Sequence, residues 1–295
     1  MSKQMVLKIF DVEHGACAML TSNQGGVDGR LAMIDSGDNA TTGWSPSSYI
    51  RQQLGRNQLD YLIVTNADQD HLSDLDGLWK ANIDVVTLVR NSGVSPDTLR
   101  AIKLMNGNLT SDIQRYLNIH AGYTGPVSVP FYLGMGGITV TTFGNRYPEF
   151  ADTNNLSLVV FIKFGNFKIL FPGDMERRGW LALLKDPAFR AELVGTKILV
   201  ASHHGRENGY CEQIFEHFKP DAVVISDKPI AHETQLMVPD YRRVIQPSGV
   251  IVSTTGARRH VLTTRRDGDI TFVVNELCDY SIYTEVGNGN LAQAA

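Results

Sequence analysis

The chain has 295 residues, of which 43% are hydrophobic and 20% charged, and it carries a formal net charge of −4. This balance indicates a globular protein with a sizeable core, and it excludes a generally basic polyanion binder while still allowing a local basic groove. The chain begins with a strand-like run, has no signal-peptide pattern, and contains no apolar run of the ~18 residues that a membrane span needs. Its few scattered cysteines favour reduced thiols. We therefore expect a cytoplasmic protein with no membrane partner.

The N-terminal third is predicted to consist of short strands with turns between them and one helix. The strands are 5–12, 16–22, 29–37 and 59–66, and the helix is 45–57. The last strand runs directly into the polar segment TNADQDH (65–71), and a helix is predicted from His71 to Ile83. Strand, polar loop and helix is the order in which α/β proteins place chemistry at the carboxyl ends of their strands.

The rest of the chain also alternates between predicted strands and helices. Residues 90–150 hold a helical stretch at 96–116 and then a segment rich in Gly, Pro and Tyr, which is an insertion, a substrate-facing segment or an ordinary connection. Further strands are predicted at 137–144, 157–165, 167–174, 197–205, 221–226, 249–255, 258–265 and 269–275, and helices at 177–186 and 210–220. Two strand-rich halves with helices favour one αββα sandwich over 1–287, with 288–295 as a frayed tail.

Three separate strand ends finish in side chains that bind divalent ions. The candidates are Asp68, Asp70 and His71, with Asn66 where a histidine would be expected, then Asp174 in FPGDME, and His203 and His204 in SHHG. Each motif alone is more often a turn or helix-cap residue than a metal ligand, so the prediction depends on their joint occurrence. Carboxylates and imidazoles from several strand ends can converge on one ion, or on two ions ~3.5–4 Å apart, which activate water for hydrolysis.

The motifs DVEHG, IDSG, TNADQDH, NNLSLVV, FPGDME and SHHG, in this order, resemble the metallo-β-lactamase superfamily. They resemble more closely the hydrolase domain of the ComEC-type competence proteins and their stand-alone bacterial relatives. The resemblance extends from Lys8 to about Asn275. It implies an αββα fold with the active site at one edge, between the two sheets.

The resemblance also implies a set of ligands. They are Asp68, Asp70, His71, Asp174 as the bridging carboxylate, and either His203 or His204, with Asn66 in place of the family's first histidine. Asn154, Asn155 and Ser157 stand where other members of the superfamily have a further ligand histidine, and Ser157 is also a candidate substrate contact.

Other positions are expected around this edge. Asp35 in IDSG resembles a residue that orients ligands, and Asp11 and His14 would lie near the same edge. His232 follows a strand end as a substrate contact, a proton donor or an ordinary loop histidine. Arg206, beside SHHG, is the best single candidate for binding a phosphate group.

The implied ligands divide into a strong and a weak ion position. The weak position draws on residues 66, 68 and about 155, which are two amides and a carboxylate. This set is poor for zinc but suits weakly held Mn²⁺ or Mg²⁺. The strong position draws on Asp70, His71, Asp174 and His203 or His204. We expect one or two divalent ions, Mn or Zn, with Mg as the other option.

The function that this pattern favours is a metal-dependent phosphodiesterase or nuclease acting on nucleic acid or a nucleotide, with Asp68, Asp70 and His204 as catalytic residues. Carboxylic esters, lactones and thioesters are substrates in the wider superfamily. The alternative is a catalytically degenerate subunit that binds a partner protein or a nucleotide in a multi-protein system, for example in phage defence. In a third, purely structural reading, the ligand run only caps a helix.

Overall fold

The computed structural model describes residues 3–24, 27–105, 107–125, 135–277 and 279–286. The predicted frayed tail at 288–295 and part of the Gly/Pro/Tyr-rich segment lie outside these residues. Within them, no helix combines the length and the hydropathy that crossing a membrane requires. Cys17 and Cys211 are free and buried.

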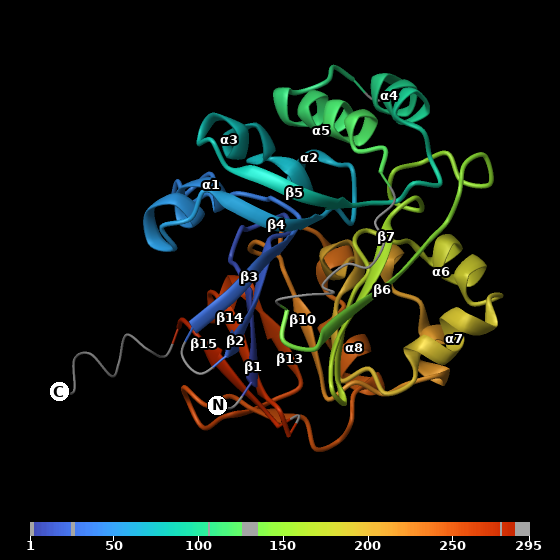
Figure 1. Cartoon of the computed structure of the whole chain (residues 1–295). Helices are drawn as coiled ribbons and strands as arrows, with labels where there is room; N and C mark the ends of the chain where they lie inside the picture. The colour runs from blue at the N-terminus through green and yellow to red at the C-terminus, as the bar shows by residue number, and fades with distance from the viewer. Residues whose placement is uncertain (1–2, 25–26, 106, 126–134, 278, 287–295) are drawn as a thin grey trace.

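Two mixed sheets face each other and form the centre of the molecule (Figure 1). The first has the order β15-β14-β1-β2-β3-β4-β5 and the second β13-β10-β9-β8-β7-β6. The strands of the first sheet are β1 (Lys3–Ile9), β2 (Ala18–Gln24), β3 (Val27–Ile34), β4 (Gln58–Ile63), β5 (Asp84–Val89), β14 (Ile270–Asn275) and β15 (Tyr280–Thr284). Those of the second are β6 (Ile138–Gly144), β7 (Leu158–Phe164), β8 (Phe167–Phe171), β9 (Ile198–Val200), β10 (Ala222–Ile225) and β13 (Val261–Thr263).

The core between the sheets follows from alternation along the strands. In β1, every second residue from Met5 to Ile9 is buried, and these side chains join Ile162 and Ile169 of the other sheet in one apolar cluster. Burial of this kind stabilises a fold by ~25 cal/mol per Å² of apolar surface. Strands β7 and β8 are buried on both faces because helices cover their outer side.

Helices cover the outer face of each sheet, so the predicted αββα sandwich is confirmed (Figure 1). The first sheet carries α1 (Pro46–Ser48), η1 (Tyr49–Gln53), α2 (Gln69–Leu72), α3 (Leu75–Lys80), α4 (Pro96–Met105) and α5 (Ser111–Gly122). The second carries α6 (Arg177–Leu183), α7 (Pro187–Leu193) and α8 (Val238–Val244). The predicted helical stretch 96–116 is two helices, and α5 packs against α2 and α3.

Several predicted elements differ in the structure. The segment predicted as a helix at 210–220 forms only a short 3-10 turn, η4 (Glu212–Glu216), and the strand predicted at 249–255 is reduced to β11 (Val250–Ile251). The strand predicted at 258–265 divides into β12 (Arg258–Arg259), β13 and the short helix α9 (Thr264–Asp267). Strands β5 and β15 are additional.

Parallel pairing brings the functional loops to one edge. β3 and β4 run parallel, and so do β8, β9 and β10. The carboxyl ends of parallel strands open on the same side of a sheet. Asp35 follows β3, the ligand run follows β4, Asp174 follows β8, and His203 and His204 follow β9.

Candidate metal centre

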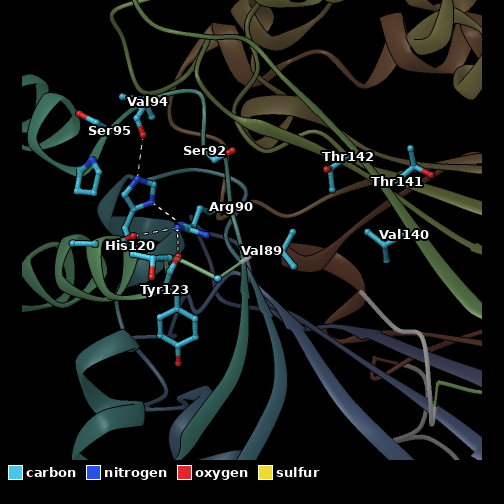
Figure 2. A pocket seen from close by; sticks show the side chains of 14 residues that line it. Val89, Arg90, Ser92, Val94, Ser95, His120, Tyr123, Val140, Thr141 and Thr142 are labelled. Atoms are coloured by element: carbon cyan, nitrogen blue, oxygen red, sulfur yellow. Dashed lines mark hydrogen bonds between the residues drawn. The ribbon is translucent and has the colours of Figure 1, made fainter. Parts of the chain in front are cut away.

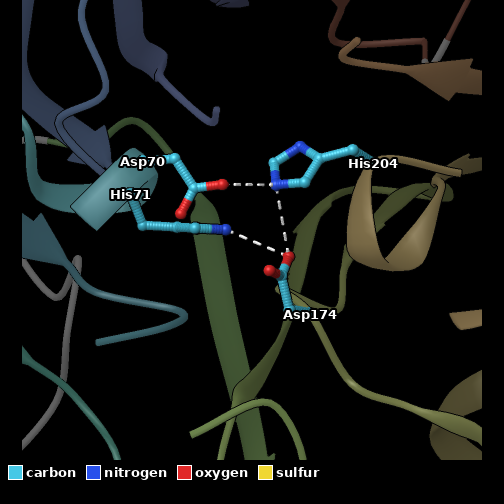
Figure 3. A group of neighbouring side chains, drawn as sticks. All are labelled: Asp70, His71, Asp174 and His204. Atoms are coloured by element: carbon cyan, nitrogen blue, oxygen red, sulfur yellow. Dashed lines mark hydrogen bonds and ion pairs between the residues drawn. The ribbon is translucent and has the colours of Figure 1, made fainter. Parts of the chain in front are cut away.

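Four side chains from three segments gather at this edge and form what we call the metal group: Asp70, His71, Asp174 and His204 (Figure 3). One potential ligand atom of each lies within 4.8 Å of those of the others. Asp70 and His71 come from α2, Asp174 from the loop after β8, and His204 from the turn after β9. Figure 3 shows all four pointing toward one another.

The metal group has the donors and the space for an ion. His71 Nε2 lies 3.0 Å from Asp174 Oδ1, and His204 Nε2 lies 3.5 Å from the same oxygen and 3.2 Å from Asp70 Oδ2. His204 Nε2 is nevertheless buried without a hydrogen-bond partner of proper geometry. A cavity of about 30 Å³ borders His71, Asp174 and His204, which is room for a water-sized particle. Two imidazoles and two carboxylates suit a divalent transition metal.

Outer partners fix the orientation of both imidazoles. Asp35 accepts a hydrogen bond from His71 Nδ1 at 2.9 Å, and it also accepts one from the backbone N–H of Thr65 at 2.7 Å. His204 Nδ1 lies 3.1 Å from the carbonyl oxygen of Ser226. With Nδ1 held in this way, Nε2 of each ring is directed to the centre, which is the usual support for a metal-binding histidine.

The backbone around the centre is strained. His203 and His204 both adopt left-handed conformations, with φ of 51° and 54°, and Asp35 has φ of 57°. Such conformations cost roughly 1–3 kcal/mol each for residues other than glycine, and they cluster at functional sites. Gly173 reaches a φ of 59° without this cost, and a Cβ there would lie 3.0 Å from Thr65 Oγ1. His204 thus carries this strain within the metal group, and His203 and Asp35 carry it in the residues beside the group.

The electrostatics of the metal group are those of tightly paired acids and bases. Burial alone would raise the pKa of Asp174, but the charges of His71 and His204 outweigh it and lower this pKa to about 2. Burial likewise opposes a charge on His71, yet Asp174 and Asp35 hold its pKa well above the ordinary value. Burial would raise the pKa of Asp70 as well, but the neighbouring imidazoles of His204 and His71 outweigh it and lower this pKa. The group therefore holds protons that a metal ion would displace.

The structure distinguishes His204 from His203. His204 belongs to the metal group, whereas His203 Nε2 lies 3.9 Å from Asp174 Oδ2 and its Nδ1 lies 3.8 Å from Glu176 Oε1. Burial lowers the pKa of His203, which keeps this ring neutral. His203 therefore lies beside the metal group but is farther from Asp174 than His204 is.

His14 and Arg206 border the metal group on another side. His14 Nε2 lies 3.6 Å from Asp70 Oδ2, and its ring centroid is 4.4 Å from that of His204. Arg206 donates to His14 Nε2 at 3.2 Å, and its own Nε is buried without a partner. On its far side, His14 Nδ1 is 3.8 Å from the buried carboxylate of Asp227. These residues form a polar wall beside the centre.

Asn66 and Asp68 are placed differently from the expected ligands. We call Asn66, Asp68, Lys103 and Thr153 the Asn66 corner. The Asn66 amide accepts from the backbone N–H of Asp68 at 3.1 Å and donates to Asn154 at 3.3 Å. The Asp68 carboxylate accepts from Lys103 Nζ at 2.5 Å and from Thr153 Oγ1. Asp68 is not a member of the metal group, and its charge is neutralised by a lysine.

Asn155 and Ser157 also serve the fold. Asn155 Oδ1 accepts from the buried N–H of Gly179 in α6 at 2.8 Å, and its amide nitrogen donates to Asp152 at 2.9 Å. Ser157 is fully buried, and its Oγ accepts from the backbone N–H of Asp174 at 3.1 Å. The structure therefore places Ser157 beneath the turn that carries Asp174 and gives it no surface toward a substrate.

Asp11 and His232 lie apart from the metal group. Asp11 Oδ1 accepts from the N–H of Glu13, and burial raises its pKa. His232 is exposed and stands at the N-cap of the 3-10 turn η5 (Glu233–Gln235). Among the hydrogen bonds and ion pairs of the described residues, none joins Asp11 or His232 to the metal group.

Sequence reasoning did not single out Lys103, Thr153 or Asp227. Asp227 is 1% exposed and binds Arg265 at 3.0 Å and Gln235 at 3.1 Å. It follows β10 as Asp174 follows β8, so its position at a strand end was a usable signal. For Lys103, in the last turn of α4, the sequence offers no such signal.

A larger hollow lies elsewhere in the molecule (Figure 2). It has a volume of about 770 Å³, and Arg90, His120 and Tyr123 line one side of it. Arg90 Nε donates to His120 Nδ1 at 2.9 Å, and another of its nitrogens donates to the Tyr123 carbonyl at 2.7 Å. The hollow shares no residue with the metal group, so the chemistry is assigned to the smaller cavity.

The chain is similar to known proteins in both sequence and fold. The chain is 25% identical over 176 residues to ComE operon protein 3 of Bacillus subtilis, a match that covers 58% of this chain and 20% of the relative. Thus the match spans about a fifth of that protein's length. Among solved structures, the metallo-beta-lactamase fold protein YhfI from Bacillus subtilis is 14% identical, covers 92% of this chain and 99% of its own, and superposes with a TM-score of 0.48. A diphosphatase of the PhnP family is 12% identical over the same shares, with a TM-score of 0.42.

The family model for the metallo-beta-lactamase superfamily matches residues 24–199, which is more than half of the chain. The matched segment contains the ligand run after β4 and Asp174 after β8. The resemblance seen in the motifs is confirmed, and this chain belongs to the metallo-beta-lactamase superfamily.

Proposed function

We propose that this protein is a metal-dependent hydrolase that cleaves phosphodiesters, as a phosphodiesterase or nuclease acting on nucleic acid or a nucleotide. The observation that carries the proposal is the buried Nε2 of His204, which has no hydrogen-bond partner and faces the carboxylates of Asp70 and Asp174. An unpaired polar atom in such a place costs about 1–3 kcal/mol, so it calls for a ligand.

The residues of the chain would divide the work as follows. Asp70, His71, Asp174 and His204 would hold a divalent ion, and Asp35 keeps His71 in the orientation to do so. When bound, such an ion lowers the pKa of water to near neutrality and stabilises charge on a phosphoryl oxygen. His14 is positioned beside Asp70 and Arg206, where its ring can contact a substrate group.

The preference for phosphate rests on the charge beside the centre. Arg206 reaches His14 at the rim, and its Nε–H lacks a partner. A guanidinium next to a metal centre suits the oxygens of a phosphate group. Arg259 and Arg265 are less available to a substrate, because Arg259 is paired with Asp267 and Arg265 with Asp227.

The second candidate is a non-catalytic subunit that binds a partner protein or a nucleotide. What favours it is the Asn66 corner, where Asn66 and Asp68 are bonded to other protein groups rather than directed to the metal group. Under this hypothesis the metal group would still bind an ion, but no phosphodiester would be hydrolysed.

The test is metal content together with hydrolysis. The protein, purified without chelator, is analysed by elemental mass spectrometry and assayed on bis-p-nitrophenyl phosphate and on single- and double-stranded DNA and RNA with Mn²⁺ or Zn²⁺. We expect bound metal and hydrolysis in the native protein, and loss of both in Asp174→Ala. Asp240→Ala changes an aspartate that pairs with Arg243 on the surface, so it serves as the control. Metal without hydrolysis of any substrate would select the second candidate, and no metal under any condition would refute both.

A further inference from the structure

The carboxylate of Asp68 does not make the hydrogen bond that its position at the start of α2 favours. Asp68 is the N-cap residue of α2, and an N-cap aspartate usually accepts a hydrogen bond from the first turn of its helix. The Asp68 side chain makes no capping bond. Both its oxygens instead accept from Thr153 Oγ1, at 3.0 and 2.9 Å, and one also accepts from Lys103. The carboxylate is thus drawn away from its own helix by a cation.

Lys103 is held in place to supply this cation. It lies in α4, 35 residues further along the chain, and only 15% of its side chain is exposed. Helices α4 and α5 pack on each other, and Gln69 of α2 donates to Asp112 of α5 at 3.0 Å. This packing fixes α4 beside α2. A partly buried lysine needs a partner for its charge, and Asp68 is that partner.

Residue 66 is an asparagine, where the family resemblance implies a histidine ligand for a second metal ion. Asn66 is 2% exposed, and both ends of its amide are bonded within the protein. Of the three side chains expected at the weak ion position, only Asp68 carries a charge, and Lys103 already neutralises it. A divalent ion there would have to displace the ammonium and would then find one carboxylate and amides, a set that is poor for zinc and suits only weakly held Mn²⁺ or Mg²⁺.

We propose that the ammonium of Lys103 takes the place of a second divalent ion, so that the centre binds a single ion at the metal group. Lys103 then acts as a fixed monovalent cation at Asp68, the one charged side chain of the expected weak ion position. It has three N–H donors, and within the described residues Asp68 is their only hydrogen-bond acceptor. The remaining donors can bind an anionic group of the substrate; this last step rests on the proposed phosphodiesterase function, whereas the ion count does not.

The experiment is a titration of the metal-free full-length protein with Mn²⁺ by calorimetry. We expect one binding event in the native protein. Asp68→Asn should keep that event with an affinity within about threefold, because the carboxylate serves Lys103, whereas Asp70→Asn, two residues along, should weaken it by at least ~10-fold. Two native events, or an equal loss in Asp68→Asn and Asp70→Asn, would overturn the proposal.

Lys103 is tested in the same titration. Lys103→Met leaves Asp68 without its cation, so we expect a second, weaker Mn²⁺ binding event. The double variant Lys103→Met/Asp68→Asn should not show this second event. Lys103→Arg keeps the charge and should show one event, and it reports whether a change at this position disturbs folding. Lys80→Met breaks an exposed lysine–aspartate pair on α3 and should also show one event. A single binding event in Lys103→Met would refute the proposal that the Lys103 ammonium takes the place of a second ion. This outcome does not depend on which substrates the protein hydrolyses.

Discussion

The metal group and the Asn66 corner begin at the same strand end, yet they satisfy their polar atoms in opposite ways. In the metal group, Asp70 and His204 face each other with a buried ring nitrogen left unpaired. In the Asn66 corner, the amide of Asn66 and the carboxylate of Asp68 are both occupied by protein partners. Unpaired, converging ligand atoms are prepared for an ion, whereas paired ones stabilise the fold. Residue types alone therefore do not define a metal site.

The largest effect is expected from the histidine that makes this contrast. His204→Ala should lower the affinity for Mn²⁺ by at least ~100-fold, more than the 10–100-fold typical of an outer partner. His203→Ala, which changes the neighbouring ring 3.9 Å from Asp174, should cost less than about 10-fold. Calorimetric titration of both variants measures the difference. Equal losses would mean that the ion sits nearer His203 than the structure indicates.

The next effect concerns the support of the metal group. Asp35→Asn keeps the size of the side chain but removes the charge that orients His71, so the affinity for Mn²⁺ should fall about 10–100-fold. Asp60→Asn is the matched control, because Asp60 also accepts a backbone N–H in the same sheet, that of Leu31 at 2.9 Å. An Asp35→Asn protein that binds the ion as tightly as the native one would remove the role of Asp35 in the centre.

The pH dependence of stability should also distinguish the metal group from the Asn66 corner. The pKa of His71 is raised above its ordinary value of 6.5 by Asp174 and Asp35, although burial opposes this. In the metal-free protein, this pairing stabilises the fold fully below pH 6.5, and its contribution is lost as the pH rises through the raised pKa.

A metal ion must displace the same protons, so its stabilising effect should grow as the pH rises. We expect the increase in Tm caused by Mn²⁺ to be larger at pH 8 than at pH 6, in native protein and in Asp68→Asn alike. A shift of Tm that is independent of pH would show that the ion does not replace protons of the metal group.

The sequence was sufficient to predict the metal group, but it was not sufficient to predict the pairing in the Asn66 corner. The strand 59–66, the polar run after it and Asp174 after the next buried strands were predictable because period and composition mark buried strands and their ends. The pairing of Asp68 with Lys103 depends on how α4 packs on α5 and α5 on α2, and contacts across 35 residues leave no local pattern.

The wrongly predicted helix at 210–220 has a related cause. Cys211, Ile214, Phe215 and Phe218 are buried with the spacing of a helix face. A 3-10 turn places residues i and i+3 on one side as well, so this spacing did not distinguish the two. Only the tertiary packing decided between them.

The smallest effect on metal binding is expected at Asn155, and it completes the comparison. Asn155→Ala removes the acceptor of the buried Gly179 N–H, so the free energy of unfolding should fall by about 1–3 kcal/mol, as measured by urea denaturation. The affinity for Mn²⁺ should stay within about threefold of the native value, because the amide of Asn155 is already bonded to Gly179 and Asp152 and so supports α6. A large loss of affinity with little loss of stability would instead make Asn155 a ligand, and the division between the metal group and its paired surroundings would then have to be drawn elsewhere.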